Sequence, residues 1–151
     1  MTRVDFYHLQ KAPLEQVLPK LCEKAYSTGK KIKILLDNEE RIEFINSLLW
    51  TYSEESFLPH GSKKDGFIED QPIFISTNIE NENGASILIL ADGAQIDISL
   101  LNTYERVLNI FDGNNDLALE RAREYWKKIK TSDNELHYWQ QNDNGVFEQK
   151  A

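Results

Sequence analysis

The chain has 151 residues, a length that fits one domain, and its hydrophobic fraction of 40% is enough for an ordinary core. A net charge of −8 argues against a general nucleic-acid binder, which normally carries a basic excess. No apolar run approaches the ~20 residues needed to span a bilayer, and the first ten residues lack the apolar segment of a signal peptide. We therefore expect one domain over residues 1–151, in the cytoplasm and away from membranes.

Five short apolar runs predict buried strands. Each is rich in β-branched residues and is flanked by Gly, Asp or Asn, which favours strands over short helices. The predicted strands cover residues 4–9, 31–36, 72–76, 86–91 and 106–111.

A first helix is predicted between the first two strands, from apolar residues at helical spacing. Gly29 is placed to end it, and Pro19 either kinks it or marks its first turn. Its apolar face includes Cys22, the only cysteine, which we expect to be buried and inert.

Two further helices are predicted, with a weaker helical pattern over residues 99–104. Asp37 and Glu40 have the spacing of a capping box, so a helix is expected to begin at Asp37. A longer helix should run from residue 115 or 116 to about residue 130.

The alternation of strands and helices predicts an α/β fold. We expect a single domain with a mostly parallel sheet, helices on both faces and Rossmann-like topology. The last segment, LHYWQQNDNGVFEQ, has two alternating runs around Asn-Asp-Asn-Gly and predicts a C-terminal β-hairpin. Residues 61–70 and 78–85 are predicted to be polar loops.

The sequence offers little sign of catalysis or of a cofactor. Both glycine-rich phosphate-binding motifs are absent, and STGKK (residues 27–31) follows a helix, where it fits a helix end better than a phosphate loop. His8, His60 and His137 do not have metal-ligand spacing. A small nucleotide- or phosphate-binding α/β enzyme stays the alternative, because the fold permits it.

The long helix combines an aromatic side chain with a basic ridge. Ala118, Ala122, Tyr125 and Ile129 share an apolar arc that should face the sheet, with Trp126 at its margin near Leu119. Just beyond the arc lie three cations: Arg123, Lys127 and Lys130. This arrangement can bind an apolar side chain together with a carboxylate. A tryptophan at the core margin beside a solvated basic stripe is the other interpretation.

Five strings in register resemble the chi subunit of bacterial DNA polymerase III. The strings are DFYHL (5–9), LLW (48–50), ESFLPHG (55–61), RAREYWKK (121–128) and YWQQNDNGVFEQK (138–150). The resemblance runs almost end to end. It implies a non-catalytic clamp-loader subunit that is a monomer within its complex and meets DNA only indirectly. It also implies two partners: the psi subunit and the acidic C-terminal tail of single-stranded DNA-binding protein.

By resemblance, the string ALERAREYWKK is the tail-binding helix. Arg123 stands where the family has a basic residue for the tail's carboxylates, Trp126 where an aromatic walls the pocket for its final phenylalanine, and Lys127 where a further cation lies. Leu119 and Asp112 depart from some members, which have a lysine and an apolar pocket wall at these positions.

The resemblance also implies a psi-binding face around SFLPHG (residues 56–61). The family's interface aromatics fall on Trp50 and Phe57. Phe57 and Leu58 would then be exposed anchors held by Pro59, and His60 would make a hydrogen bond that orders the loop. Two alternatives are that Phe57 plugs the local core, and that a helicase or another equivalent partner uses this face instead of psi.

Overall fold

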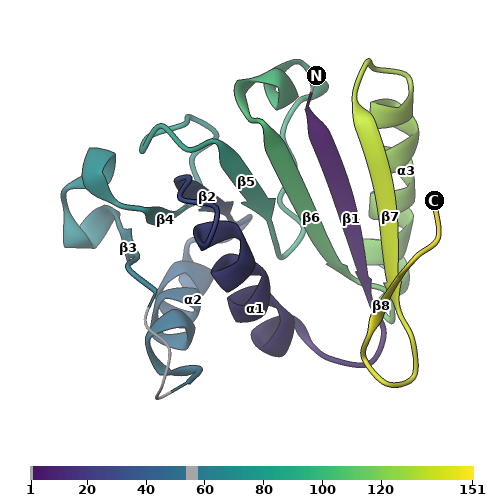
Figure 1. Cartoon of the computed structure of the whole chain (residues 1–151), viewed down its shortest axis with the longest axis horizontal. Coiled ribbons are helices and arrows are strands. Elements are labelled where there is room, and N and C mark those ends of the chain that lie inside the picture. Colours follow the sequence, from purple (N-terminus) through teal and green to yellow (C-terminus); the bar gives the residue numbers. More distant parts are fainter. Residues whose placement is uncertain (1, 54–57) are drawn as a thin grey trace.

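Eight strands form one sheet in the part of the chain that is described, residues 2–53 and 58–151 of a computed structural model (Figure 1). The sheet order is β3-β4-β2-β5-β6-β1-β7-β8, and neighbours pair in parallel except for the antiparallel pair β7–β8. The strands are β1 (Arg3–Leu9), β2 (Ile32–Leu35), β3 (Gly61–Ser62), β4 (Ile73–Ser76), β5 (Ile87–Leu90), β6 (Arg106–Asp112), β7 (Glu135–Gln141) and β8 (Phe147–Gln149). The five predicted strands and the C-terminal hairpin are confirmed.

Helices cover both faces of the sheet, as predicted. Helices α1 (Leu14–Tyr26) and α2 (Glu40–Thr51) lie on one face, and α3 (Asp116–Lys130) lies on the other with a 3-10 segment, η3 (Ile98–Thr103) (Figure 1). Successive side chains of β2 point to opposite faces of the sheet. Ile34 therefore packs in the core on the α1 side, and Leu35 packs in the core on the α3 side. None of the helices in the described residues is long and apolar enough to cross a bilayer.

The structure corrects the predicted start of α2 and decides between the two predicted places of Pro19 in α1. Helix α2 begins at Glu40, not at Asp37, because the side-chain Oδ1 of Asn38 accepts the amide of Glu40 at 2.8 Å and forms the turn before the helix. Pro19 lies inside α1, beyond its first turn. Gly29 follows the end of α1 with a φ of 79°, a left-handed conformation that glycine adopts without strain.

The polar loop after β4 is tied to the sheet by a buried lysine. Lys33 on β2 is fully buried, and its Nζ donates to the carbonyls of Asn78 and Glu80 and lies 2.7 Å from the carboxylate of Glu82. Burial lowers the pKa of Lys33, and the hydrogen bond to Glu82 opposes this. The loop thus covers the β2–β4 end of the sheet on the face opposite α1 and α2.

The chain changes direction where β1 and β6 lie side by side. From β1 it passes through α1 toward β2, and from β6 it passes through α3 toward β7, on the opposite face and in the opposite direction. Gly113, just after β6, lies so close to β1 that an added Cβ would meet the His8 ring at 1.9 Å and the carbonyl of Leu9 at 2.7 Å. Because one of these contacts is with backbone, this turn requires glycine.

Candidate functional site

Helix α3 presents its apolar arc to the sheet as the sequence predicts. Asn115 caps the helix, since its Oδ1 accepts the amide of Ala118 at 3.0 Å. Ala122, Tyr125 and Ile129 are buried against the sheet. Burial raises the pKa of Tyr125 to about 12, and its hydroxyl donates to the carbonyl of Ile96 at 2.8 Å, which holds the helix against the segment after β5.

Trp126 is half-buried at the margin of this arc and has a fixed aromatic support. Its ring meets Phe6 edge-on, with centroids 5.3 Å apart, and meets Tyr138 edge-on at 5.4 Å. Leu119 is also half-buried and packs against the same core. The indole is therefore held by two strands, β1 and β7, and part of its surface stays open to a partner.

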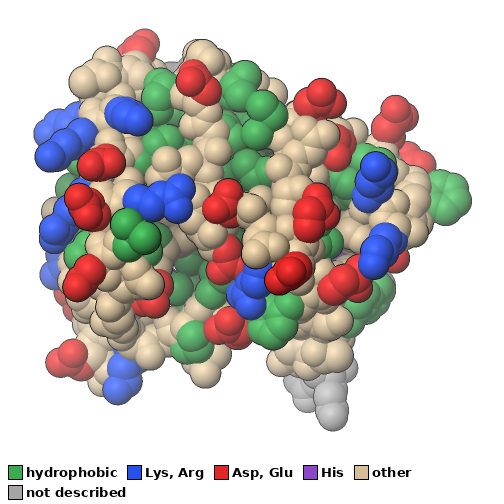
Figure 2. Space-filling model, turned by 180° about the vertical axis from the view of Figure 1, so that it is seen from behind, with side chains coloured by type: hydrophobic (Ala, Val, Ile, Leu, Met, Phe, Trp, Pro, Cys, Tyr) green, Lys and Arg blue, Asp and Glu red, His purple; other side chains and the backbone are tan. Residues whose placement is uncertain are grey.

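The cations beside Trp126 are free to meet a carboxylate. Arg123, Lys127 and Lys130 are exposed, and none forms an ion pair within the described residues. In Figure 2 the lysine and arginine side chains gather at the left edge, over α3. Lys127 and Lys130 lie in the last turn of α3, where the helix dipole favours positive charge.

Two residues of this neighbourhood were missed by the sequence analysis. Nδ1 of His8 lies 2.7 Å from the hydroxyl of Tyr138, and both rings contact Phe111. Burial lowers the pKa of His8, as does the positive charge of Arg123, while Asp112 opposes both; the ring is therefore neutral at neutral pH. Burial raises the pKa of Tyr138, and Arg123 opposes the shift.

Arg123 thus influences the pKa of both His8 and Tyr138. Alternation places Phe6 and His8 on one face of β1, and Tyr138 on one face of β7. The parallel pairing of these two strands, in which Phe6 is the partner of Tyr138, was not deducible from that pattern.

A second candidate surface lies on α2. Trp50 is 51% exposed, and its ring lies 4.4 Å from the ring of His60. The hydrogen bonding expected for His60 is present, because its two ring nitrogens lie 2.6 Å from the carbonyl of Leu58 and 3.0 Å from that of Asn46. Phe57 lies outside the described residues.

The expectation for Leu58 is wrong. This residue is 2% exposed and belongs to the core beneath α1 and α2, so it is not an exposed anchor. The reason is its place in the chain, since β3 begins three residues later and joins the sheet beside β4, which draws Leu58 under α2. Pro59 beside it is half-buried.

Two other side chains of chemical interest are Asp92, which follows β5, and Cys22 on α1. Asp92 occupies a turn with a φ of 52° and pairs with Arg41 at 2.7 Å. Cys22 is fully buried, and burial raises the pKa of its thiol to about 12. No group of three or more metal-binding side chains occurs in the described ranges, 2–53 and 58–151.

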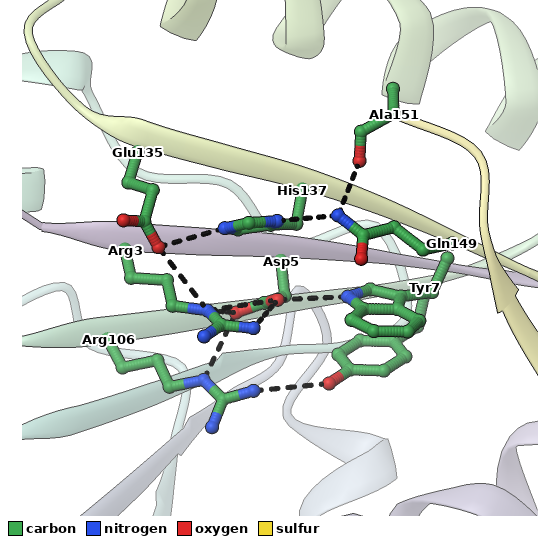
Figure 3. Close-up of polar contacts among 9 residues, drawn as sticks. Arg3, Asp5, Tyr7, Arg106, Glu135, His137, Gln149 and Ala151 are labelled. Carbon is green, nitrogen blue, oxygen red and sulfur yellow. Dashed lines mark hydrogen bonds and ion pairs between the residues drawn. The ribbon is translucent and has the colours of Figure 1, made fainter.

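A polar network locks β1 to its neighbours on the face away from α3 (Figure 3). The carboxylate of Asp5 is fully buried and accepts from Arg3, from Arg106 at 3.1 Å and from the Trp139 indole at 2.9 Å. Arg106 also donates to the hydroxyl of Tyr7 at 3.3 Å. Because these groups come from β1, β6 and β7, the network fixes the strand that carries Phe6 and His8.

Comparison with known proteins decides the family. Residues 1–137, which include the helix bearing Trp126 and the helix bearing Trp50, match the family described as DNA polymerase III chi subunit, HolC. The chain belongs to the chi subunit family. A protein of Rickettsia prowazekii (strain Madrid E), described as probable DNA polymerase III subunit chi, is 30% identical over 159 residues, covering 100% of this chain and 93% of that protein. This chi-family chain is therefore an accessory subunit of the DNA polymerase III complex, with a role in replication.

Proposed function

We propose that this chi-family chain is a non-catalytic adaptor that binds the acidic C-terminal tail of single-stranded DNA-binding protein through α3. The observation that carries the proposal is the pairing of a supported, half-exposed indole with three cations that have no carboxylate partner among the described residues. The family resemblance assigns tail binding to the same helix.

In this proposal the terminal phenylalanine of the tail lies against Trp126 and Leu119. The carboxylates of the tail meet Arg123 and Lys127, with Lys130 as a further cation. Phe6 and Tyr138 contribute by holding the indole, so its orientation does not have to be fixed when the tail binds. Arginine is suited to the carboxylate because its planar guanidinium donates two parallel hydrogen bonds.

The affinity for a single tail should be modest. A dissociation constant around micromolar corresponds to roughly −8 kcal/mol. Several tails on one protein-coated strand would raise retention through effective concentration, without any new contact. The adaptor would then hold the polymerase complex near coated single strands while touching DNA only indirectly.

Fluorescence polarisation with a labelled acidic tail peptide that ends in phenylalanine tests this proposal. We expect saturable binding that is at least about tenfold weaker for Arg123→Ala and for Trp126→Ala, because each removes a contact worth about 1.4 kcal/mol or more. Arg121→Ala is the matched control, since Arg121 is also exposed on α3 but donates to the carbonyl of Gly93 on the side toward β5.

A peptide without the terminal phenylalanine is the second control, and it should not bind. If the folded wild-type protein does not bind the intact peptide, the proposed tail site is wrong. Equal losses for Arg121→Ala and Arg123→Ala would show general attraction to the basic helix instead of a defined site.

We further propose that the face around Trp50, together with Phe57, binds the psi subunit or an equivalent partner such as a helicase. The exposure of Trp50 supports this, and so does its ring contact with His60. Co-purification of the partner with Trp50 and Phe57 variants is the measurement that decides it.

A further inference from the structure

A crevice of about 580 Å³ opens at the carboxyl ends of β5, β6 and β1. Its walls are the turns that follow these three strands and the first half of α3. β1 and β6 are the neighbours from which the chain departs in opposite directions (Figure 1). In open α/β sheets, this is the position where ligands bind. The volume lies within the range of about 300–1,000 Å³ that is usual for small-molecule sites.

Two helices begin at this crevice. Leu14 and Glu15 line it from the first turn of α1, and Leu117 and Ala118 line it from the first turn of α3. The backbone amides of Leu14, Glu15 and Leu117 donate to no acceptor in the described part of the chain. The helices have 13 and 15 residues, long enough for each to carry a partial positive charge at this end. The two ends together favour an anion.

Two cations that line the crevice have no carboxylate partner among the described residues. Glu15 and Asp92 both lie against Arg41, at 3.6 Å and 2.7 Å, so its single positive charge offsets one of their two negative charges. Arg121 and Lys11 line the crevice and form no ion pair with any described residue.

Arg121 is held at the rim of the crevice. One carboxylate of the lining, Asp112, would repel a bound anion. The guanidinium of Arg121 donates to the carbonyl of Gly93 at 3.0 Å, and a Cβ on Gly93 would come within 3.0 Å of it. Asp112 is the third carboxylate of the lining, and it accepts the amide of Asn114 at 2.9 Å. We therefore expect weak rather than tight anion binding.

A buried amide inside the crevice points independently to a ligand. Asn109 on β6 is only 6% exposed and lines the crevice, yet its side chain makes no hydrogen bond with any described residue. Ala94 and Ala122, which have small side chains, line the same crevice. Its side-chain oxygen and nitrogen are not fully enclosed, so they are open to the crevice, where a ligand can hydrogen-bond to the amide of Asn109 in place of solvent.

We propose that this crevice binds a small phosphorylated molecule of mononucleotide size. The phosphate lies between the starts of α1 and α3, beside Arg121 and Lys11, and the polar body of the ligand reaches the amide of Asn109. The site is separate from the proposed tail site, because Arg121 and Arg123 point to different sides of α3. In Figure 2 the surface is hollowed beside α3, near the middle of the view.

Thermal unfolding of the full chain with inorganic phosphate, ribose 5-phosphate, AMP and adenosine tests the proposal at matched ionic strength. We expect AMP and ribose 5-phosphate at a few times their dissociation constants to raise the melting temperature by about 2–4 °C. Inorganic phosphate should act less, and adenosine should have no effect because it lacks the anion. The shift should disappear in Arg121→Gln and in Asn109→Leu, and it should persist in Arg123→Gln.

The Asn109→Leu variant also distinguishes a ligand-binding role of Asn109 from a purely structural one. If Asn109 only supported the fold, the leucine variant would be less stable without ligand. In this proposal the leucine variant without ligand is about as stable as the wild type, since no hydrogen bond of the Asn109 side chain with a described residue is lost. No shift with any phosphate compound would overturn the proposal, as would equal shifts with AMP and adenosine, or a shift lost only in Arg123→Gln. The tail peptide should bind Arg121→Gln normally in every case, so this proposal and the tail proposal can fail separately.

Discussion

Asp5 shows how one buried charge stabilises the strand that supports the candidate site. Burial tends to raise the pKa of its carboxyl group. Hydrogen bonds from Arg3 and Trp139 and the charge of Arg106 outweigh burial, so the pKa in the folded state lies below its ordinary value. The two arginines are only partly buried, with side chains 41% and 38% exposed, so solvent screens part of their attraction.

Asp5→Asn should therefore lower the free energy of unfolding at neutral pH, by about 1–3 kcal/mol, because it removes the charge that both arginines meet. A carboxyl whose pKa is lowered by folding stabilises the protein above its unfolded pKa, and this contribution is lost as the pH falls through the folded value. The difference between wild type and variant should thus be full above about pH 5 and should shrink below about pH 4.

Urea unfolding between acid and neutral pH measures this difference. Glu135→Gln is the matched control, since Glu135 is 48% exposed and lies 3.8 Å from the same Arg3. It should change stability by less than about 1 kcal/mol at any pH. A difference between wild type and Asp5→Asn that stays constant down to the lowest pH would contradict the assigned role of the charge.

At the scale of elements, α2 and the segment that follows it carry two residues in opposite environments, one exposed to solvent and one buried in the core. Trp50 is 51% exposed at the end of the helix, whereas Leu58 is 2% exposed beneath it. Both are large apolar residues, and both were predicted to face a partner. Only the packing of α2 over β3 and β4 separates them, because it closes over Leu58 and leaves the indole outside.

Truncation of these two residues should therefore have different results. Leu58→Ala should lower the free energy of unfolding by about 2–5 kcal/mol, the usual cost of emptying a buried leucine site. Trp50→Ala should leave folding largely intact and reduce co-purification of psi, or of an equivalent partner, by about tenfold or more. Phe57→Ala should behave like Trp50→Ala if Phe57 belongs to the same face.

Chemical denaturation and pull-down with a co-expressed partner measure the two effects. Phe44→Ala is a control on the same helix, since Phe44 is 44% exposed and lies under Arg41 at 4.3 Å. Unfolding of Phe57→Ala would favour the core-plug interpretation. Retention of the partner by both aromatic variants would remove α2 from the proposed interface.

At the scale of the whole molecule, charge is unevenly distributed. Residues 117–131 carry five cations and two acids, a balance of +3, so the rest of the chain carries −11. A long phosphate backbone would meet mostly repulsion from such a body, whereas a short acidic tail can lie along α3 alone. α3 and α2 lie on opposite faces of the sheet, so the two proposed partners can bind together.

Salt should therefore weaken tail binding, because the cations of α3 are exposed and the attraction is screened. We expect affinity for the tail peptide to fall by about 3–10-fold between ~50 mM and ~500 mM salt, since the Debye length shortens several-fold over this range. Arg123→Ala should show a shallower dependence, and Trp126→Ala should keep the wild-type slope at lower affinity. A titration series in salt checks this, and equal affinity at all concentrations would contradict the electrostatic part of the proposal.

Much of the fold was predictable from local patterns. The strands, the face of α3 and the hairpin depend on the spacing of apolar residues and on turn residues, which act over a few neighbours along the chain. The aromatic and basic composition of the candidate site was likewise readable from one helix, since Arg123, Trp126 and Lys127 lie within five positions of each other. These features need no knowledge of which strands pair.

The tertiary structure alone decided what depends on pairing between distant segments. It placed Tyr138 and Phe6 against Trp126, buried Leu58, moved the start of α2 to Glu40, and opened the crevice at the carboxyl ends of β5, β6 and β1. Periodicity shows which face of a strand is apolar, but many strand orders satisfy the same pattern. The order is selected by the packing of the whole sheet, because only the complete set of contacts outweighs the entropy of ordering the chain.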